Sequence, residues 1–222
     1  MFKYVLTFSK TGIICYTSHL DIMRMFNRVI KRAGIRLSYS QGFNPHPKMG
    51  FAQPLSLGYS GLNELMELET EEEYEPEDIK DKLTELMPKG IDILKCEKKN
   101  GASKKTLAAQ TVAAAYKIYI PISDTIGISG EEIKNSYMNQ NHITALKRQK
   151  KKKEPVEIDI KPMIRELEII NQDHELIVEA VLDSGSISNL SPELLIKTLQ
   201  KHLSLDIDRG EIEITREKIY FQ

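Results

Sequence analysis

The segment YTSHLDIMRMFNRVIKRAG, residues 16–34, has cationic side chains at helical spacing. At 100° per residue, the apolar residues gather on one side of the predicted helix and the cations on the other: Ile22, Phe26, Val29, Ile30 and Ala33 against Arg24, Arg28, Lys31 and Arg32. A solvated face of a packed helix is the alternative, but such a face usually mixes Glu with Lys at i, i+4 spacing. The only acid here is Asp21. The pattern therefore favours contact with an anion.

The start of this helix has its own signals. Thr17-Ser18 precede the apolar periodicity and Gly34 follows it, which predicts a helix that ends near Ala33. Ser18 and Asp21 have the spacing of a capping box, so capping accounts for the one acid. His19 falls in the first helical turn, where it either packs or contacts a phosphate.

The segment YSQGFNPHPKMGFAQPLSLG, residues 39–58, predicts an ordered loop leading into a strand, because Gly and Pro recur through it. Its polar side chains stand among phenylalanines, a mixture that can stack on bases and bind their edges: Tyr39, Ser40, Gln41, Asn44, His46 and Lys48 with Phe43 and Phe51. The alternative is that Asn44-Pro45 only makes a turn and the phenylalanines belong to the core. Both interpretations stay open at this point.

Metal and acid–base chemistry are less well supported. Cys15, His19, Asp21 and His46 could supply zinc ligands, but no HxxxH or HxH pair is present. The remaining thiol, Cys96, forms no CxxC pair, so neither a disulfide framework nor an iron–sulfur cluster is indicated. There is no P-loop, GxGxxG, GxSxG or HExxH motif. We therefore expect no metal, no cofactor and no catalytic residue, although Asp21 or His46 could act as acid–base groups in an enzyme.

Charge is distributed unevenly along the chain. Residues 1–62 contain eight Lys and Arg against Asp21 alone, and residues 64–78 reverse the sign with nine acids. A second cationic run, Lys147, Arg148 and Lys150–Lys153, is typical of a solvated loop or of a contact with a phosphate backbone. The asymmetry predicts an anionic partner on one face.

The order of predicted elements repeats. Pro76-Glu77 and Pro192-Glu193 each open a helix that is followed by a short apolar strand. We expect an α+β fold of two ferredoxin-like split β-α-β halves, produced by internal duplication. The expected domains are residues 1–97, a linker at 98–114 that holds a small Ala-rich helix, and residues 115–222. Further strands are predicted at 3–9, 35–40, 48–57, 64–70, 142–148, 156–169 and 175–182.

No run approaches the roughly 18 apolar residues of a membrane span, and the amino terminus lacks a signal-peptide h-region. The expected location is the cytoplasm, with no membrane and no DNA partner.

Residues 16–58 and the ELMELE segment at 64–69 resemble the radical SAM-associated (radical SAM-linked) proteins, a bacterial family built on a domain of unknown function. The resemblance is close over about the first 70 residues and is carried by SHLD at 18–21, Arg24, RAG at 32–34 and SQGFNPHP at 40–47. Members are encoded beside radical SAM proteins, or fused to them, often among genes for ribosomal components and RNA processing. The resemblance implies a radical SAM partner and points to RNA as the substrate.

A second resemblance is architectural, to the pseudouridine synthases that modify transfer RNA and join two ferredoxin-like halves around a basic cleft. Those enzymes need an aspartate in the loop where this chain has SQGFNPHP, and no Asp lies there. The resemblance therefore leaves open an RNA-modifying enzyme or an inactive relative that kept the RNA-binding cleft.

Three functions follow. The leading one is a non-catalytic accessory that binds or presents RNA for the radical SAM enzyme. In it Arg24, Arg28 and Arg32 contact phosphates, while Gln41, Phe43, Asn44 and His46 recognise a nucleotide or a partner loop; Ser18, His19, Asp21, Tyr39 and Lys48 complete the candidate set. The second is a protein-docking module for that partner without RNA contact, in which the acidic stretch 64–78 meets a basic patch. The third is an enzyme of the pseudouridine synthase type.

Overall fold

The computed structural model describes residues 1–99, 105–122, 127–147, 154–172 and 174–222. The contacts among these residues divide the chain into two compact units. The first comprises Met1–Thr111 with Lys218–Gln222, and the second comprises Val112–Glu217. Both units combine a sheet with helices, so the α+β class expected from the sequence is confirmed.

The first unit has the strand order β4-β1-β3, β2 also pairs with β3, and these three pairs are antiparallel. With helices after the first and third strands, this is the split β-α-β arrangement. Its elements are β1 (Phe2–Lys10), η1 (Gly12–Tyr16), α1 (His19–Arg32), β2 (Met49–Phe51), β3 (Ser60–Thr70), α2 (Pro76–Leu86), β4 (Ile91–Lys98) and α3 (Leu107–Gln110).

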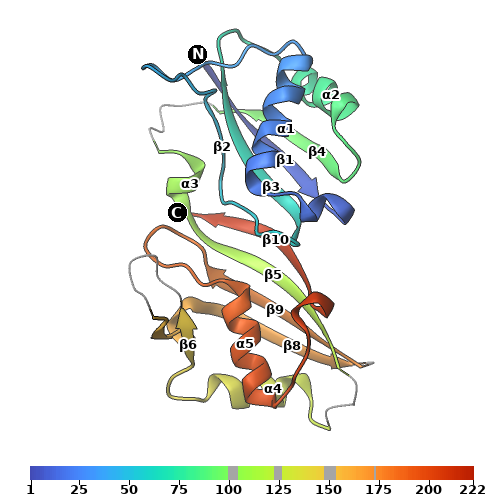
Figure 1. Ribbon diagram of the computed structural model, residues 1–222, viewed down its shortest axis with the longest axis vertical. Helices are drawn as coiled ribbons and strands as arrows, with labels where there is room; N and C mark the ends of the chain where they lie inside the picture. Colours follow the sequence, from blue (N-terminus) through green and yellow to red (C-terminus); the bar gives the residue numbers. More distant parts are fainter. Residues whose placement is uncertain (100–104, 123–126, 148–153, 173) are drawn as a thin grey trace. The chain divides into compact units, whose positions relative to one another are not determined.

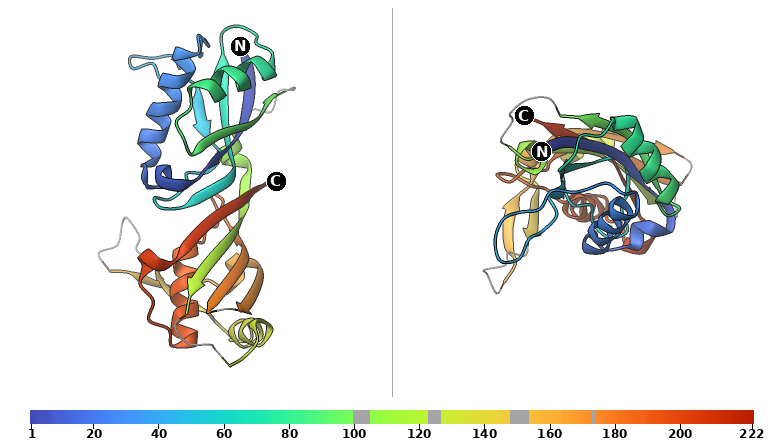
Figure 2. Two further views of the ribbon diagram at one scale, coloured as in Figure 1. Left: turned by 90° about the vertical axis from the view of Figure 1, so that its right-hand side faces the viewer. Right: turned by 90° about the horizontal axis from the view of Figure 1, so that it is seen from above.

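The larger core of the first unit lies between its helices and its sheet. Helices α1 and α2 lie over the same face of the sheet (Figures 1 and 2), and their apolar sides pack with the buried sides of β1, β3 and β4. In β3 the alternation expected from the sequence is present, because Met66 and Leu68 are buried while Leu65 and Glu67 are partly exposed. The buried cluster includes Tyr4, Leu6, Phe8, Ile22, Phe26, Ile30, Ile79 and Leu83.

The second unit repeats this strand order as β10-β5-β9-β8. Here a two-stranded hairpin, β6-β7, is inserted between the first helix of the unit and β8. The duplicated topology therefore agrees with the expectation from sequence. The elements are β5 (Thr111–Pro121), α4 (Gly130–Met138), β6 (Thr144–Lys147), β7 (Val156–Asp159), η2 (Lys161–Met163), β8 (Ile164–Gln172), β9 (Glu175–Asp183), α5 (Pro192–Leu203), η3 (Arg209–Glu211) and β10 (Glu213–Phe221).

Three expected strands differ from those observed. Residues 35–40 form only isolated bridges, at Leu37 and Tyr39, and the expected strand 48–57 shortens to β2. The expected strand 156–169 is two strands, because β7 pairs with β6 and β8 pairs with β9. Pro162 lies in the 3-10 turn between them and has no N–H to continue a ladder.

Helix α4 begins unusually close to the sheet. A Cβ atom added at Gly130 would lie 2.0 Å from the carbonyl oxygen of Ile169 in β8, a backbone atom that cannot rotate away. Ser129 caps the helix: its hydroxyl accepts the backbone N–H of Glu132, and the Glu132 carboxylate accepts the backbone N–H of Ser129. The cap and the glycine together position α4 against β8.

We expect Gly130→Ala to lower the free energy of unfolding by about 1–3 kcal/mol, because overpacking against backbone forces α4 away from β8. Urea denaturation measures the change. Gly127→Ala is the matched control, since nothing lies within 4 Å of a Cβ at that position. A Gly130→Ala protein as stable as the Gly127→Ala protein would contradict the close approach.

Candidate nucleic-acid interface

Helix α1 starts at a cap that uses Asp21. The hydroxyl oxygen of Ser18 accepts the backbone N–H of Asp21 at 3.2 Å. The carboxylate of Asp21 accepts the Ser18 hydroxyl at 2.6 Å and the Arg24 guanidinium at 3.0 Å. These hydrogen bonds, from Ser18 first and Arg24 second, lower the pKa of Asp21. Only the first half of the expected capping box is formed, because the acid bonds the Ser18 hydroxyl instead of its backbone N–H.

The two sides of α1 separate as the sequence indicates. Ile22, Phe26, Val29 and Ile30 are buried in the core of the first unit. On the opposite side Arg24 is paired with Asp21. The other three cations are exposed and make no ion pair with any residue in the described part of the chain: Arg28, Lys31 and Arg32. This side, which we call the cationic face of α1, therefore has charge available for a partner.

The loop after α1 is closed at its base. The backbone N–H of Ser40 donates to the carbonyl of His46 at 2.8 Å, and the backbone N–H of His46 donates to the Ser40 hydroxyl at 2.9 Å. Gly42 has φ of +128°, a conformation that favours glycine. Residues 41–46 are exposed, and the side chain of Phe43 is fully exposed. The loop thus presents an aromatic ring to solvent on a fixed base, so the core alternative does not apply to Phe43.

The loop and the cationic face meet at Tyr39. The ammonium nitrogen of Lys31 lies 5.8 Å from the centroid of the Tyr39 ring, within the range of a cation–π interaction. Tyr39 pairs with Pro47 across the base of the loop. A cation that suits a phosphate therefore lies next to an aromatic ring that suits a base, a combination also used by single-stranded nucleic-acid sites.

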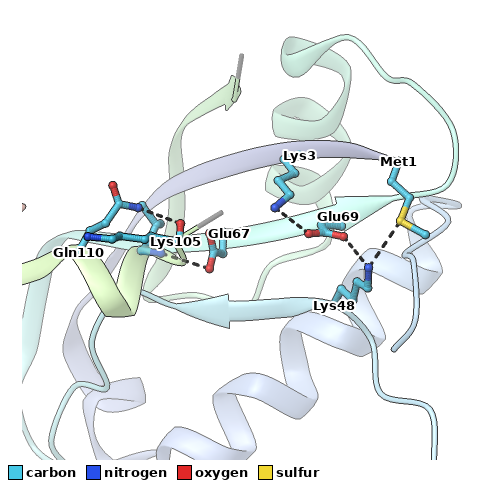
Figure 3. A network of polar contacts seen from close by, with 8 residues as sticks. Met1, Lys3, Lys48, Glu67, Glu69, Lys105 and Gln110 are labelled. Carbon is cyan, nitrogen blue, oxygen red and sulfur yellow. Dashed lines mark hydrogen bonds and ion pairs between the residues drawn. The ribbon is translucent and has the colours of Figure 1, made fainter. Parts of the chain in front are cut away.

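Lys48 has a structural partner. Figure 3 shows the carboxylate of Glu69 between two lysines, with Lys48 at 2.9 Å and Lys3 at 3.1 Å. Burial alone would raise the pKa of Glu69, but the hydrogen bonds from the two lysines outweigh burial and lower the pKa. A groove of about 340 Å³ is lined by Lys3, Lys48, Glu67, Glu69 and Thr106. The acids of β3 neutralise these lysines, so the groove lacks the uniform charge of the α1 face.

His19 is packed. Its ring meets the ring of Phe51 edge-on, with centroids 5.2 Å apart. It also lines a cavity of about 20 Å³, room for one water molecule, together with Lys10 and Glu64, both buried. Burial, and next the charge of Lys10, lower the pKa of His19. The imidazole is therefore neutral at pH 7 and offers no positive charge to a phosphate.

The four candidate zinc ligands do not form a metal site within the described residues. Cys15 is buried, with its sulfur 3.5 Å from the carbonyl oxygen of Lys10 and 3.4 Å from the hydroxyl of Ser60. Among the described residues, no group of three or more His, Cys, Asp or Glu side chains is arranged to hold a metal ion.

No helix in the described part of the chain is long and apolar enough to cross a membrane.

Residues 3–192 match the family model described as "Uncharacterized protein conserved in bacteria (DUF2344)". The chain belongs to the DUF2344 family. No curated protein matches the sequence. The bacterial domain of unknown function implied by the SHLD and SQGFNPHP motifs is therefore confirmed.

Among solved structures, the DUF2344 chain is similar to a chain in the crystal structure of a Cbf5–Nop10–Gar1 complex, at 12% identity and a TM-score of 0.51 over 97% of its residues. It spans about half, 48%, of that chain. At this identity the likeness shows the fold alone. An unknown protein from Galdieria sulphuraria (10% identity, 97% and 98% of the two chains, TM-score 0.30) also matches. The encapsulated DyP-type peroxidase of Mycobacterium smegmatis matches as well, at 12% identity over 90% of this chain and 83% of that chain, with a TM-score of 0.25.

Two features of this DUF2344 site are not predicted by the sequence. Lys31 is recognised as part of the cationic side, but its contact with Tyr39 joins residues on a helix and on a loop and has no local signal. Lys10 is one of the eight cations counted in residues 1–62, but it is buried and donates to the carbonyl oxygens of Cys15 and Thr17, both at 3.2 Å. The cationic run at 147–153 lies outside the described residues except for Lys147, whose ammonium donates to the carbonyl of Asn189.

The pKa of His19 yields a test by NMR titration. We expect the imidazole to titrate below 6.5, the ordinary value, because folding disfavours its charged form. Since the unfolded chain then binds the proton at higher pH, stability is lost as the pH falls below 6.5. His19→Phe should therefore lose less stability than the wild type between about pH 7 and about pH 5. His46→Gln, on the exposed loop, is the control variant, and a His19 midpoint at or above 6.5 would contradict the packed arrangement.

Proposed function

We propose that this DUF2344 protein is a non-catalytic accessory that binds RNA through the cationic face of α1 and the loop at residues 39–46. The observation that carries the proposal is the juxtaposition of three cations without ion-pair partners among the described residues and a loop that exposes Phe43. Phosphates neutralise such cations and release counterions, and unstacked bases pack on aromatic rings.

The candidate residues divide by role. Arg28 and Arg32 contact phosphates, and Arg24 joins them from its pair with Asp21. Phe43 stacks on a base, while the polar groups of Gln41, Asn44 and His46, all exposed, bind base edges or sugar hydroxyls. Ser18, Asp21, His19 and Lys48 support the site, because each is committed to the helix cap, the core or an ion pair. Tyr39 joins the loop to the helix.

In this function another polypeptide in the cytoplasm catalyses the reaction on the bound RNA. The resemblance to the radical SAM-associated proteins supports a radical SAM enzyme as that partner. Cys15 and Cys96 are the only thiols of the chain, and both are buried. Burial raises the pKa of Cys96 to about 12, which disfavours its thiolate, and two thiols do not supply the four ligands of an iron–sulfur cluster. We retain residues 1–97 and 115–222 as the proposed domains, with the RNA surface in the first.

A protein-docking role is the second candidate, and a specific feature favours it. Ile13, Tyr16 and Leu20 lie in η1 and the first turn of α1, and their side chains are 91%, 73% and 65% exposed. Exposed apolar side chains at neighbouring positions are typical of a protein interface. This surface could dock the radical SAM enzyme whether or not RNA binds. A third candidate, RNA modification of the pseudouridine synthase type, draws support only from the fold likeness to Cbf5 and lacks an aspartate in the loop.

The charge of α1 is tested with Arg28→Ala/Arg32→Ala. Fluorescence anisotropy with a labelled single-stranded RNA pool at several salt concentrations should show weaker binding and a log–log salt slope flatter by about 1.4, since each phosphate contact contributes about 0.7. Lys82→Ala/Lys89→Ala removes the same charge from exposed positions in and after α2 and should leave the slope unchanged. If both double variants weaken binding equally, the contact is not on α1. If the wild type binds no RNA, the docking candidate takes its place.

The aromatic ring is tested separately with Phe43→Ala. Losing one stacked base costs about 1–3 kcal/mol, so affinity should fall roughly 5- to 150-fold. The salt slope should stay at the wild-type value because no charge is removed. Leu57→Ala, which truncates another exposed apolar side chain of the first unit, is the control. An unchanged affinity in Phe43→Ala would remove the loop from the RNA surface.

A further inference from the structure

The second unit contains a polar pocket that the RNA proposal does not use. Its volume is about 210 Å³, and its lining includes Gln140, His142, Thr144, Lys201 and His202. These residues come from the chain that follows α4, from the start of β6 and from the last turn of α5. Two imidazoles and an ammonium group thus share one pocket, although 60 residues of sequence separate the histidines.

His142 is oriented by Asp159. The Nδ1 atom of His142 lies 2.9 Å from Oδ2 of Asp159. The other carboxylate oxygen accepts the backbone N–H groups of Ile143 and Lys161, each at 3.0 Å. The bond from His142, followed by that from the Lys161 backbone, lowers the pKa of Asp159. The aspartate therefore stays charged, its Oδ2 accepts the hydrogen bond from Nδ1–H, and Nε2 of His142 is left for a ligand.

His202 is oriented in a similar way by a serine. The Ser136 hydroxyl donates its one proton to the carbonyl of Ile133 at 2.9 Å. With that proton used, the Ser136 oxygen, 2.9 Å from Nε2 of His202, accepts a hydrogen bond from that nitrogen in the tautomer that carries Nε2–H. The ring is also held edge-on against Tyr137, with centroids 5.5 Å apart. Nδ1 is consequently the atom of His202 that remains available.

Lys201 and Thr144 add two further donors. Neither the ammonium of Lys201 nor the hydroxyl of Thr144 has a hydrogen-bond or ion-pair partner among the described residues, and both residues are exposed. Cations in the last turn of α5 also suit the helix dipole, which accounts for one positive group there. The helix dipole does not account for the imidazole of His142, which lies outside α5 and is held by the carboxylate of Asp159. The lining residues themselves include no acid, and the carboxylate of Asp159, which bonds His142, is not part of the lining.

We propose that this pocket binds a phosphate group, as inorganic phosphate or as a phosphate monoester. Lys201 supplies the positive charge and the hydroxyl of Thr144 donates a hydrogen bond to the oxygens. Nε2 of His142 and Nδ1 of His202 donate to the oxygens in the imidazolium form, which a bound anion favours. The site is independent of the cationic face of α1, so it stands whether or not that face binds RNA.

The test follows the histidine Cε1–H signals of the full chain by NMR during a millimolar titration with inorganic phosphate. The signals of His142 and His202 should shift saturably, while that of His174, which lies in the same unit but does not line the pocket, should not. Lys201→Ala should weaken binding about tenfold through the loss of one charge-assisted contact. Lys197→Ala, an exposed lysine on the same helix outside the pocket, should leave it within about twofold.

Titrations with AMP and adenosine then distinguish a site for a phosphate monoester from a site for free phosphate. Saturation by phosphate and AMP identifies a monoester site, and saturation by phosphate alone identifies a site for the free ion. Either result supports the proposal, and Arg28→Ala/Arg32→Ala should give the same titration as the wild type. The absence of saturable shifts in the wild type, equal losses in the two lysine variants, or equal binding of adenosine would overturn it.

Discussion

Three phenylalanine rings from three elements meet in the core of the first unit: Phe8 of β1, Phe26 of α1 and Phe51 of β2. Their centroids are 5.0 Å apart for Phe8 and Phe26, 5.7 Å for Phe26 and Phe51, and 5.6 Å for Phe8 and Phe51. These contacts fix the rotation of α1 about its axis, because Phe26 can be buried only if the arginines of the opposite side face solvent. They also hold Phe51 at the end of β2, the strand that follows the loop carrying Phe43. The candidate interface thus depends on apolar packing beneath it.

Ion pairing decides which cations of the first unit remain available. Lys3 and Lys48 share Glu69, and Arg36 pairs with Glu72 at 2.8 Å, so the acidic stretch neutralises cations close to it. Lys10 is buried. The positive charge that the composition distributes over residues 1–62 is therefore concentrated by the fold on α1, where Asp21 is the single acid. Exposed pairs of this kind add little stability, so their main effect is on the shape of the electrostatic field.

The features predicted correctly from sequence are those with a local period or a local cap. The two-sided α1, its Ser18 cap and the alternation through Met66 and Leu68 belong to this group, and the paired Pro-Glu helix starts indicated the repeated topology. The predictions that failed concern features that depend on partners far along the chain. The expected strand 156–169 is divided because its two parts pair with different strands, β7 with β6 and β8 with β9. The Lys48–Glu69 pair depends on strand register. The pocket in the second unit had no signal, because His142 and His202 meet only when α5 packs beside β6.

The shared topology explains where the distinctive surfaces arise. In a split β-α-β unit, the connection between the first helix and the second strand leaves the core, so its length and composition are weakly constrained by packing. In the first unit this connection is the SQGFNPHP loop, and in the second it holds the β6-β7 hairpin together with His142. Each connection returns to a helix of its own unit, through Lys31 and Tyr39 in the first and at the pocket shared with His202 in the second. Polar surfaces that could bind ligands can therefore diverge at this one position while both cores keep the same strand order.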